Sequence, residues 1–438
     1  MKTQAFGAAP WGLALLLLAA NSLSFVDRML LTLLVGPIRA ELGVSDTAIS
    51  LLHGLAFALF YALAGLPLGR LADTGHRPRL MATGIALWSV MTSACGFAAN
   101  FATMFIARTG VAVGEASLSP AAISLLSERF PSTMAARAIA VFQSGIFVGT
   151  ALSMLGGGLL LAWFESHPLP GPLADLSPWR SVFVVVGAPG LLIALALLLV
   201  RETRVKQTNA QADRVSVRAA LAHILGAGRL YFGHVLAFTA ITILAYGSIS
   251  WMPSVLVRVH GLQTSEVGLL LGFALLIAGP LGVMSSGVLV DALAKRRIAS
   301  GPMLAALVSV VLLAIAVPAY ALAPNLESAR IAAYGLAFAQ SFPYGIASAS
   351  LAIVAPAALR GQLVALYLMI SNLLGLTLGP LLVALLTDNV FRDDAAVGLS
   401  LSVLPLLTTP LAIAGILLCW GPYRRANTRA EEQSPPMA

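Results

Sequence analysis

Two acids and two arginines lie deep inside apolar stretches of this 438-residue chain. Asp27 and Arg28 are adjacent in an apolar run over residues 11–38, and Arg108 and Glu115 share a later run. A run of this length can cross a bilayer, since a spanning helix needs about 20 apolar residues. A charge near the middle of such a helix costs at least about 2.5–3.5 kcal/mol, so it is rarely kept without a partner or a watery cavity. Two acids and two bases in this setting indicate a pathway for protons and a charged substrate.

The composition independently places the chain in a membrane. It is 59% hydrophobic and 10% charged, with a mean hydropathy of +0.91, whereas soluble domains carry about 25% charged residues. Cys95 and Cys419 both lie in apolar runs, so we expect no disulfide framework, no metal site and no cofactor. The first apolar run continues past signal-peptide length, which indicates a retained first span. The predicted fold class is an all-α integral membrane protein.

Apolar runs bounded by charges and by Pro and Gly clusters predict twelve transmembrane helices. They lie near residues 11–38, 47–69, 80–99, 102–126, 136–163, 180–200, 231–257, 265–290, 301–323, 328–355, 362–387 and 397–421. The longest polar stretch, over residues 201–229, separates six spans from six. The predicted parts are an N-terminal six-helix bundle (1–200), a cytoplasmic linker (201–230), a C-terminal six-helix bundle (231–421) and a cytoplasmic tail (422–438).

The basic residues predict the orientation. Nineteen of the 26 lysines and arginines fall in loops on the side of both termini, five fall on the opposite side, and two lie in spans. Loops rich in Lys and Arg stay in the cytoplasm. We therefore expect a multi-pass protein of the inner (plasma) membrane with both termini cytoplasmic. The same asymmetry accounts for the net charge of +8, so nucleic-acid binding is not expected.

The two halves of the chain resemble each other in sequence. A shift of 218 residues places Gly43 on Gly261 and Asp73 on Asp291, with basic residues following each aspartate. A single ungapped shift aligns glycine, acidic and basic residues together. An internal repeat explains this better than chance does. A parallel repeat about an axis along the membrane normal is an arrangement that secondary transporters use.

The loop after the second predicted span resembles a signature of the major facilitator superfamily. It reads Gly69-Arg-Leu-Ala-Asp73-Thr-Gly-His-Arg77-Pro-Arg79, with Thr74 where the family usually has a basic residue. The resemblance implies two six-helix bundles around a central cavity and an aspartate that closes the cytoplasmic side against a helix N-terminus and an arginine from the neighbouring bundle half. The implied cytoplasmic gate consists of Gly69, Asp73, Arg77, Arg79, Arg137 and, in the second copy of the loop, Asp291.

Two further stretches look like the Spinster family within that superfamily. They are Phe25-Val-Asp27-Arg28 and the run from Arg108 through Gly114-Glu115 to Pro120. Known members export lysolipids or sphingosine-1-phosphate, and bacterial relatives are presumed to be proton-coupled. The resemblance therefore implies that Asp27, Arg28 and Glu115 form a coupling and head-group site, which Arg108 completes.

Helix geometry sets which of these groups can meet. Arg108 and Glu115 are seven residues apart, so they project from nearly one face of a helix about 10 Å apart along its axis. Asp27 and Arg28 are about 100° apart around their helix and cannot point at one spot. Arg28 can therefore bridge to Glu115 while Arg108 meets Asp27. The alternative is that two buried ion pairs only pin helices together.

Further polar and aromatic side chains are candidates for lining the substrate site. Arg28 and Glu115 are joined there by Ser117, Tyr246, Trp251, Ser341, Tyr344, Tyr367 and Asn372. For the aromatic residues, helix packing or an interfacial belt is an equally good interpretation. The glycines of the fifth span, including Gly145 and Gly149, are best explained by close helix packing. His53 lies inside a span, where a lone histidine is a weak signal.

The sequence thus predicts a secondary active, proton-coupled transporter that works by alternating access and exports a lysolipid-like or sphingosine-1-phosphate-like substrate. We expect a monomer whose partners are membrane lipids, a small amphipathic cargo and protons. The alternative within transport is an antiporter or symporter of small drugs or organic anions. An intramembrane enzyme or a receptor is disfavoured, because the chain lacks metalloprotease, serine-hydrolase and nucleotide-binding motifs.

Overall fold

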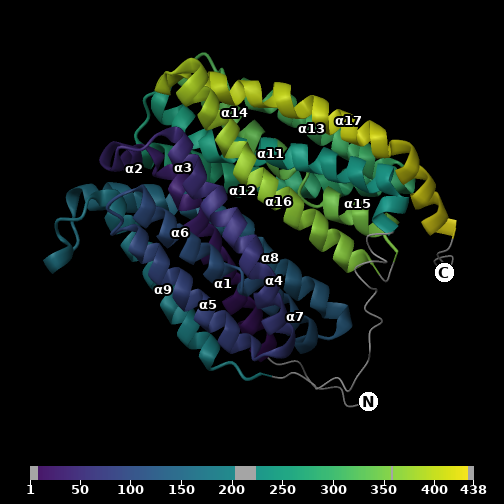
Figure 1. Ribbon diagram of the computed structural model, residues 1–438, viewed down its shortest axis with the longest axis horizontal. Helices are drawn as coiled ribbons and strands as arrows, with labels where there is room; N and C mark the ends of the chain where they lie inside the picture. The colour runs from purple at the N-terminus through teal and green to yellow at the C-terminus, as the bar shows by residue number, and fades with distance from the viewer. Residues whose placement is uncertain (1–7, 203–222, 357–358, 433–438) are drawn as a thin grey trace. The chain divides into compact units, whose positions relative to one another are not determined.

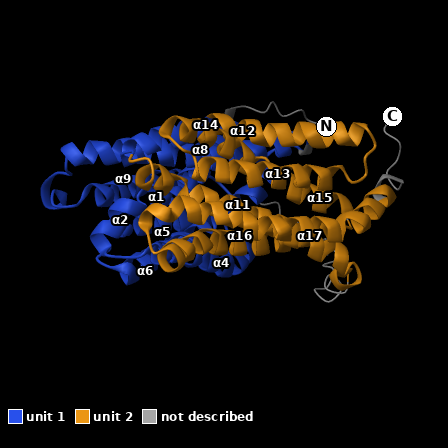
Figure 2. Ribbon diagram, turned by 90° about the horizontal axis from the view of Figure 1, so that it is seen from above, with its two compact units in different colours: residues 1–206, 262–276 blue, residues 207–261, 277–438 orange. Residues whose placement is uncertain are grey.

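The computed structural model describes residues 8–202, 223–356 and 359–432, and the regular secondary structure in these ranges is helical throughout (Figure 1). The chain divides into two compact units (Figure 2). Unit 1 comprises residues 1–206 with 262–276, and unit 2 comprises residues 207–261 with 277–438. The predicted all-α membrane fold is confirmed by this architecture.

Unit 1 contains the described helices of the first half of the chain. They are α1 (Ala8–Leu33), α2 (Val35–Leu42), α3 (Asp46–His53), α4 (Leu55–Thr74), α5 (Arg77–Cys95), α6 (Phe101–Glu115), α7 (Leu118–Arg129), α8 (Ser132–Ser166), η1 (Gly171–Leu173) and α9 (Pro178–Leu198). Inside the unit, α1 packs mainly against α8, and α5 packs between α6 and α9.

Unit 2 contains the helices of the second half, and α12 starts in the segment that clusters with unit 1. They are α11 (Gly228–Arg258), α12 (Thr264–Lys295), α13 (Gly301–Ala321), α14 (Leu326–Ser341), α15 (Ile346–Val354), α16 (Arg360–Leu385), η2 (Leu386–Phe391), η3 (Asp394–Ala396) and α17 (Val397–Glu432). Here α11 packs mainly against α16 and α17.

Among the described residues, eleven helical segments are long and apolar enough to cross a membrane. Helix α5 occupies the remaining predicted span, and its composition explains why it falls short. It carries Ser89, Thr92 and Ser93 in addition to two arginines near its start. The serines serve close packing, because a Cβ on Gly187 of α9 would lie 2.3 Å from Ser93 Oγ. Small polar side chains of this kind let transmembrane helices approach closely.

Glycines bring equivalent helices together in both units. In unit 1, a Cβ on Gly149 of α8 would lie 2.2 Å from the carbonyl oxygen of Ser22 on α1. In unit 2, a Cβ on Gly379 of α16 would lie 2.5 Å from the carbonyl oxygen of Ile243 on α11. These are the first and fifth helices of each half, so the packing interpretation of the span-five glycines is confirmed at Gly149 and recurs in the second half.

Backbone details support the internal repeat. Gly43 ends α2 with φ +62°, and its predicted counterpart Gly261 follows α11 with φ +70°. Both adopt the left-handed conformation that favours glycine. The fourth span of each half also begins alike, since Asn100 and Asn325 each form a capping box at a helix start. In both halves that helix stops within its span and a shorter helix follows.

Three spans of unit 1 are interrupted partway along, and the interruptions shape the site described below. The second span breaks between α3 and α4 at Gly54, and the fourth breaks between α6 and α7 at Ser117. The first bends at Leu34, between α1 and α2. Irregular backbone at membrane depth is tolerated where protein buries it or where it lines a watery cavity.

Candidate functional site

The predicted bridge between Arg28 and Glu115 is present in unit 1. Arg28 Nη2 lies 2.6 Å from Glu115 Oε2, and the Ser24 hydroxyl donates to the same oxygen at 2.7 Å. Ser24 and Arg28 are four residues apart on α1, so they share one helix face. Arg28 is 9% and Glu115 2% exposed. A buried ion pair therefore joins α1 to the end of α6, while Glu115 Oε1 has no hydrogen-bond partner among the described residues.

Asp27 faces a different helix, as its position one residue before Arg28 predicts. The Thr92 hydroxyl of α5 donates to Asp27 Oδ2 at 3.0 Å, and Asp27 is fully buried. Its second carboxylate oxygen, Oδ1, has no hydrogen-bond partner in the described part of the chain. Arg108 meets Asp27 through the main chain rather than the predicted carboxylate, since Arg108 Nη1 donates to the Asp27 carbonyl oxygen at 3.1 Å. Helix geometry cannot foresee this, because the Arg108 side chain is long enough to reach either acceptor.

Aromatic side chains surround the Arg28 guanidinium. Its central carbon lies 4.3 Å from the ring centre of Phe57, 4.6 Å from that of Phe25 and 5.5 Å from that of Tyr61. The Arg108 guanidinium lies 5.8 Å from the same Phe57 ring. Cation–π contacts of this kind are worth about 0.5–2 kcal/mol. Arg28 is thus held by aromatic faces as well as by Glu115, and the aromatic contacts do not depend on the charge of the acid.

His53 belongs with this group by its position. It is the last residue of α3, is 3% exposed, and lies within electrostatic range of Arg28 and Arg108. Neither ring nitrogen has a hydrogen-bond partner among the described residues. Buried polar groups are normally paired, so an imidazole with neither nitrogen bonded is unusual among the described buried side chains. From the sequence, His53 can be recognised only as a histidine inside a predicted span.

The coupling candidates therefore gather in unit 1, whereas most substrate-site candidates lie in unit 2. Trp251 is 1% exposed and its indole N–H donates to the Pro380 carbonyl at 3.0 Å. Tyr367 is 5% exposed, with its ring centre 5.3 Å from that of His234. Both side chains are packed between helices of unit 2, which agrees with the packing interpretation rather than with a lining role.

Tyr246 and Asn372 lie together in unit 2, where the Tyr246 hydroxyl donates to Asn372 Oδ1 at 3.3 Å. Ser341 is 7% exposed at the end of α14, and Tyr344 is 49% exposed beyond it. In unit 1, the Ser117 hydroxyl donates to the Gly114 carbonyl at 2.8 Å and packs on Gly84, so it serves the helix break.

The implied cytoplasmic gate residues do not pair with one another in the described structure. Asp73 is exposed near the end of α4, Arg137 is exposed on α8, and Asp291 is exposed near the end of α12. No ion pair of Asp73, Arg79, Arg137 or Asp291 occurs within the described residues. Gly69 lies on α4 with nothing within 4 Å of a Cβ placed there. The gate remains a prediction.

Arg77, another of the implied gate residues, lies in a network of ion pairs inside unit 1. It is fully buried, and its guanidinium contacts Glu202 at 2.5 Å and Glu128 at 2.6 Å. Arg77 Nη1 also donates to Ser124 Oγ at 3.0 Å, and its main-chain N–H donates to Glu202 at 2.8 Å. One arginine thus ties the start of α5 to the end of α7 and to the chain after α9.

We expect Arg77→Ala to lower the free energy of unfolding by about 3 kcal/mol, because it leaves partly buried carboxylates unpaired. Glu128→Gln should cost about 1 kcal/mol or less, since Glu128 is 40% exposed. Thermal unfolding of the detergent-solubilised protein measures both changes. Arg79→Ala is the control, because Arg79 is exposed two residues away. Equal effects of Arg77→Ala and Arg79→Ala would contradict the assignment.

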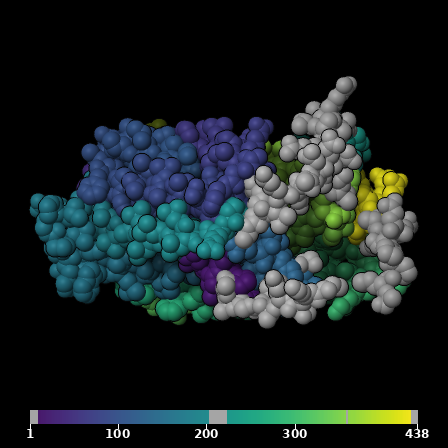
Figure 3. All heavy atoms as spheres, turned by 90° about the horizontal axis from the view of Figure 1, so that it is seen from below, coloured from purple at the N-terminus to yellow at the C-terminus, as the bar shows by residue number. Residues whose placement is uncertain are grey.

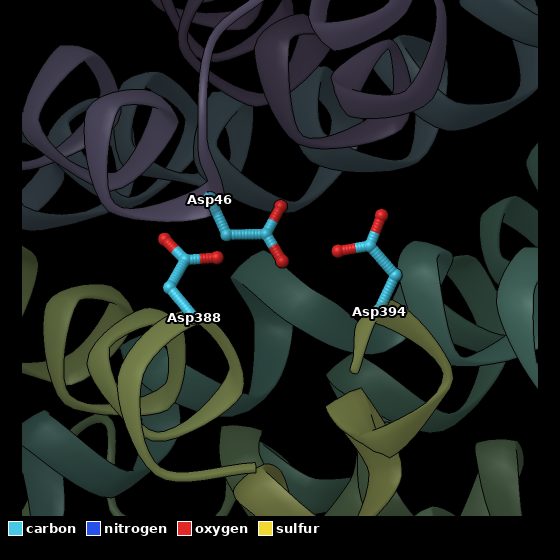
Figure 4. Close-up of side chains that lie close together, drawn as sticks. All are labelled: Asp46, Asp388 and Asp394. Carbon is cyan, nitrogen blue, oxygen red and sulfur yellow. The ribbon is translucent and has the colours of Figure 1, made fainter. Parts of the chain in front are cut away.

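Three further aspartates are drawn in Figure 4, and they belong to different units. Asp46 opens α3 in unit 1, where its Oδ1 lies 3.1 Å from Arg39 Nη1. Asp388 lies in η2 and Asp394 opens η3, both in unit 2.

The helical membrane fold with its buried charges is that expected of a transporter, and comparison with known proteins identifies the class. The profile of the Major Facilitator Superfamily matches residues 17–380. The chain belongs to the major facilitator superfamily.

Three similar proteins show which transporters of this superfamily the chain resembles. An MFS-type efflux pump of Mycolicibacterium smegmatis is 30% identical over 422 residues, covering 95% of this chain and 94% of the relative. A probable L-galactonate transporter of Escherichia coli is 28% identical, covering 65% of this chain and 62% of the relative. The crystal structure of a bacterial homologue of the human lysosomal transporter Spinster, inward-facing and unoccupied, matches with a TM-score of 0.77 at 26% identity, covering 98% and 99% of the two chains. The expected resemblance to Spinster is confirmed.

Several side chains at the site were not singled out by the sequence. Ser24, Phe57, Tyr61 and Thr92 all contact a charged group there. Ser24 carried a usable signal, since it lies four residues before Arg28 and so on the same helix face. The other three carried none, because their relation to α1 exists only once the helices have packed.

Proposed function

We propose that this transporter is proton-coupled, works by alternating access, and exports an amphipathic cargo with an anionic head group, such as a lysolipid or a sphingosine-1-phosphate-like lipid. The observation that carries the proposal is the buried contact of Arg28 with Glu115, with Asp27 as the adjacent residue. Ionisable groups inside a membrane-spanning bundle are expensive and usually functional. The efflux-pump relative supports export as the direction.

The proposed coupling of cargo to protons depends on Arg28, because Glu115 and the cargo can both pair with this residue. Arg28 neutralises Glu115 in the described state. An anionic head group that binds Arg28 competes with Glu115 for the guanidinium, so cargo binding and the protonation of Glu115 depend on each other. Substrate and proton are thereby linked, and the linkage must be reciprocal in binding free energy. The rings of Phe57 and Tyr61 support Arg28 while it changes partner, because their attraction to the cation is independent of Glu115.

Asp27 supplies a second acid in the same cluster. Its carboxylate accepts a hydrogen bond from Thr92 and keeps one buried oxygen without a partner among the described residues. A proton on that oxygen removes a buried charge, which lowers the cost of burial. We assign Asp27 and Glu115 to proton coupling, Arg28 to coupling and head-group binding, and Arg108 to holding the α1 main chain at Asp27.

A small organic anion is the second candidate cargo. Arg28 suits any carboxylate or phosphate, because a guanidinium forms paired hydrogen bonds with both. The relative named as a probable L-galactonate transporter favours a sugar acid of this kind. The lipid-like cargo is favoured by the Spinster structure, which matches nearly the whole chain.

Proteoliposomes with a pH gradient and an internal pH-sensitive dye test the proposal directly. Adding an anionic lysophospholipid should dissipate the gradient faster with wild-type protein than in protein-free vesicles. A zwitterionic lysolipid of equal chain length is the control for detergent-like leakage. If a hexuronate dissipates the gradient and the lysolipid does not, the second candidate replaces the first. Proton movement unchanged by every cargo would contradict proton coupling.

We also propose that both termini are cytoplasmic in a bacterial plasma membrane, as the asymmetry of the basic residues indicates. Reporter fusions after residues 215 and 430 should both give cytoplasmic signals. A fusion in the loop around residue 170, between α8 and α9, is the internal control and should read periplasmic. A periplasmic signal at either of the first two positions would contradict the orientation.

A further inference from the structure

A basic cavity lies at one end of unit 2. It has a volume of about 630 Å³ and lies between the start of α11 and the last turns of α17. Three arginines line it, Arg229 from α11 and Arg425 and Arg429 from α17, and none of its lining residues is acidic. The C-terminal end of α17, yellow in Figure 3, lies on the molecular surface.

The three guanidinium groups have no ion pair among the described residues. Arg425 and Arg429 are four residues apart, so they stand on one face of α17, where like charges destabilise a helix. A third positive charge at Arg229 adds to the repulsion. An anion bound among the three would convert that repulsion into charge-assisted hydrogen bonds.

The chain runs through the cavity wall as helical backbone. Residues 223–226 are helical and lead into α11 at Gly228, and the N–H groups of Leu230 and Tyr231 donate to the Ala227 carbonyl oxygen at 2.9 and 3.3 Å. The first turn of α11 holds no acidic residue. The attraction of this cavity for an anion therefore rests on its three arginines.

The surroundings indicate where the anion comes from. Helices α11 and α17 are both long and apolar enough to span the membrane, so the cavity at their ends lies at the membrane surface. Leu225 lines the cavity and is 72% exposed, and Phe232 on the next turn of α11 is 63% exposed. Apolar side chains beside a cationic cavity suit a molecule with an anionic head and acyl chains.

We propose that this cavity binds the phosphate head group of an anionic membrane phospholipid. The arginines contact the phosphate, and the acyl chains lie along the apolar surface near Leu225 and Phe232. Basic clusters at the cytoplasmic ends of spans attract anionic lipids. Each arginine near the surface raises the affinity for such a lipid about fivefold. The site is separate from cargo binding, and it joins the first and last helices of unit 2.

Native mass spectrometry of the full-length protein in mild detergent tests the site by titration with dioleoylphosphatidylglycerol and, separately, dioleoylphosphatidylcholine. Wild-type protein should bind the anionic lipid more tightly. The triple variant Arg229→Gln, Arg425→Gln, Arg429→Gln should bind it about a hundredfold more weakly and lose the preference. Arg425→Gln alone should weaken binding about fivefold, which keeps the test valid if the triple variant is unstable.

Matched controls separate the possible sources of binding. Lys295→Gln, Arg296→Gln and Arg360→Gln together remove three exposed positive charges elsewhere in unit 2 and should preserve lipid binding. Arg28→Gln should preserve it as well, and a loss there would place the lipid in the transport site and overturn the proposal. Inorganic phosphate at millimolar concentration should not compete, since full competition would indicate a site for a soluble anion. Unchanged lipid preference in the triple variant would also overturn the proposal.

Discussion

Glu115→Gln is expected to reduce proton-driven transport to the level of protein-free vesicles while keeping cargo binding at or above the wild-type level. The amide can still accept hydrogen bonds from Ser24 and Arg28 through its oxygen, so the contact between α1 and α6 survives in weaker form. It cannot take up or release a proton, and it no longer competes with an anion for Arg28 as a charged partner. Uptake driven by a pH gradient, measured beside equilibrium binding on the same preparation, separates the two effects.

Asp27→Asn and Ser24→Ala complete this comparison. Asp27→Asn should also impair coupling, because it removes the other titratable acid of the cluster. Ser24→Ala removes one hydrogen bond to Glu115 without changing any charge, so it should retain coupled transport. Wild-type transport with unchanged pH dependence in both Glu115→Gln and Asp27→Asn would mean that these acids only hold helices together.

Arg28→Ala is expected to weaken binding of an anionic cargo by about ten- to a hundredfold, since a hydrogen bond to a charged group is worth about 1.5–3 kcal/mol. The substitution also removes the guanidinium partner of the buried Glu115, which disconnects this acid from the cargo. Arg28→Lys should recover part of the binding, because it keeps the charge and loses the planar fork. Equilibrium binding to the purified variants is the measurement.

Two controls make the Arg28 result specific. An uncharged analogue of the cargo should bind wild type and Arg28→Ala about equally, because it does not use the guanidinium. Arg330→Ala removes an exposed arginine whose neighbour Glu327 lies 3.6 Å away and should leave anion binding unchanged. Equal loss of the charged and uncharged cargo would show that Arg28 supports the structure of the site rather than the head group.

The sequence by itself determined the membrane class, the repeat and the charged centre. Apolar runs of spanning length locate the helices because a bilayer admits almost no other backbone structure. The predicted pair Arg28 and Glu115 is found at 2.6 Å, since both residues had to be neutralised and few partners exist in an apolar span. The repeat was readable because Gly43 and Gly261 serve the same left-handed turn in both halves.

Only the tertiary structure decided which neighbours those charges have. Glu202 lies 125 residues from Arg77, so no local pattern relates the two residues. Thr92 reaches Asp27 across 65 residues, and the Phe57 ring meets two arginines from different helices. Helical periodicity states which residues share a face, but it does not state which helix that face meets. That choice depends on packing, where glycines such as Gly149 set how closely two helices approach.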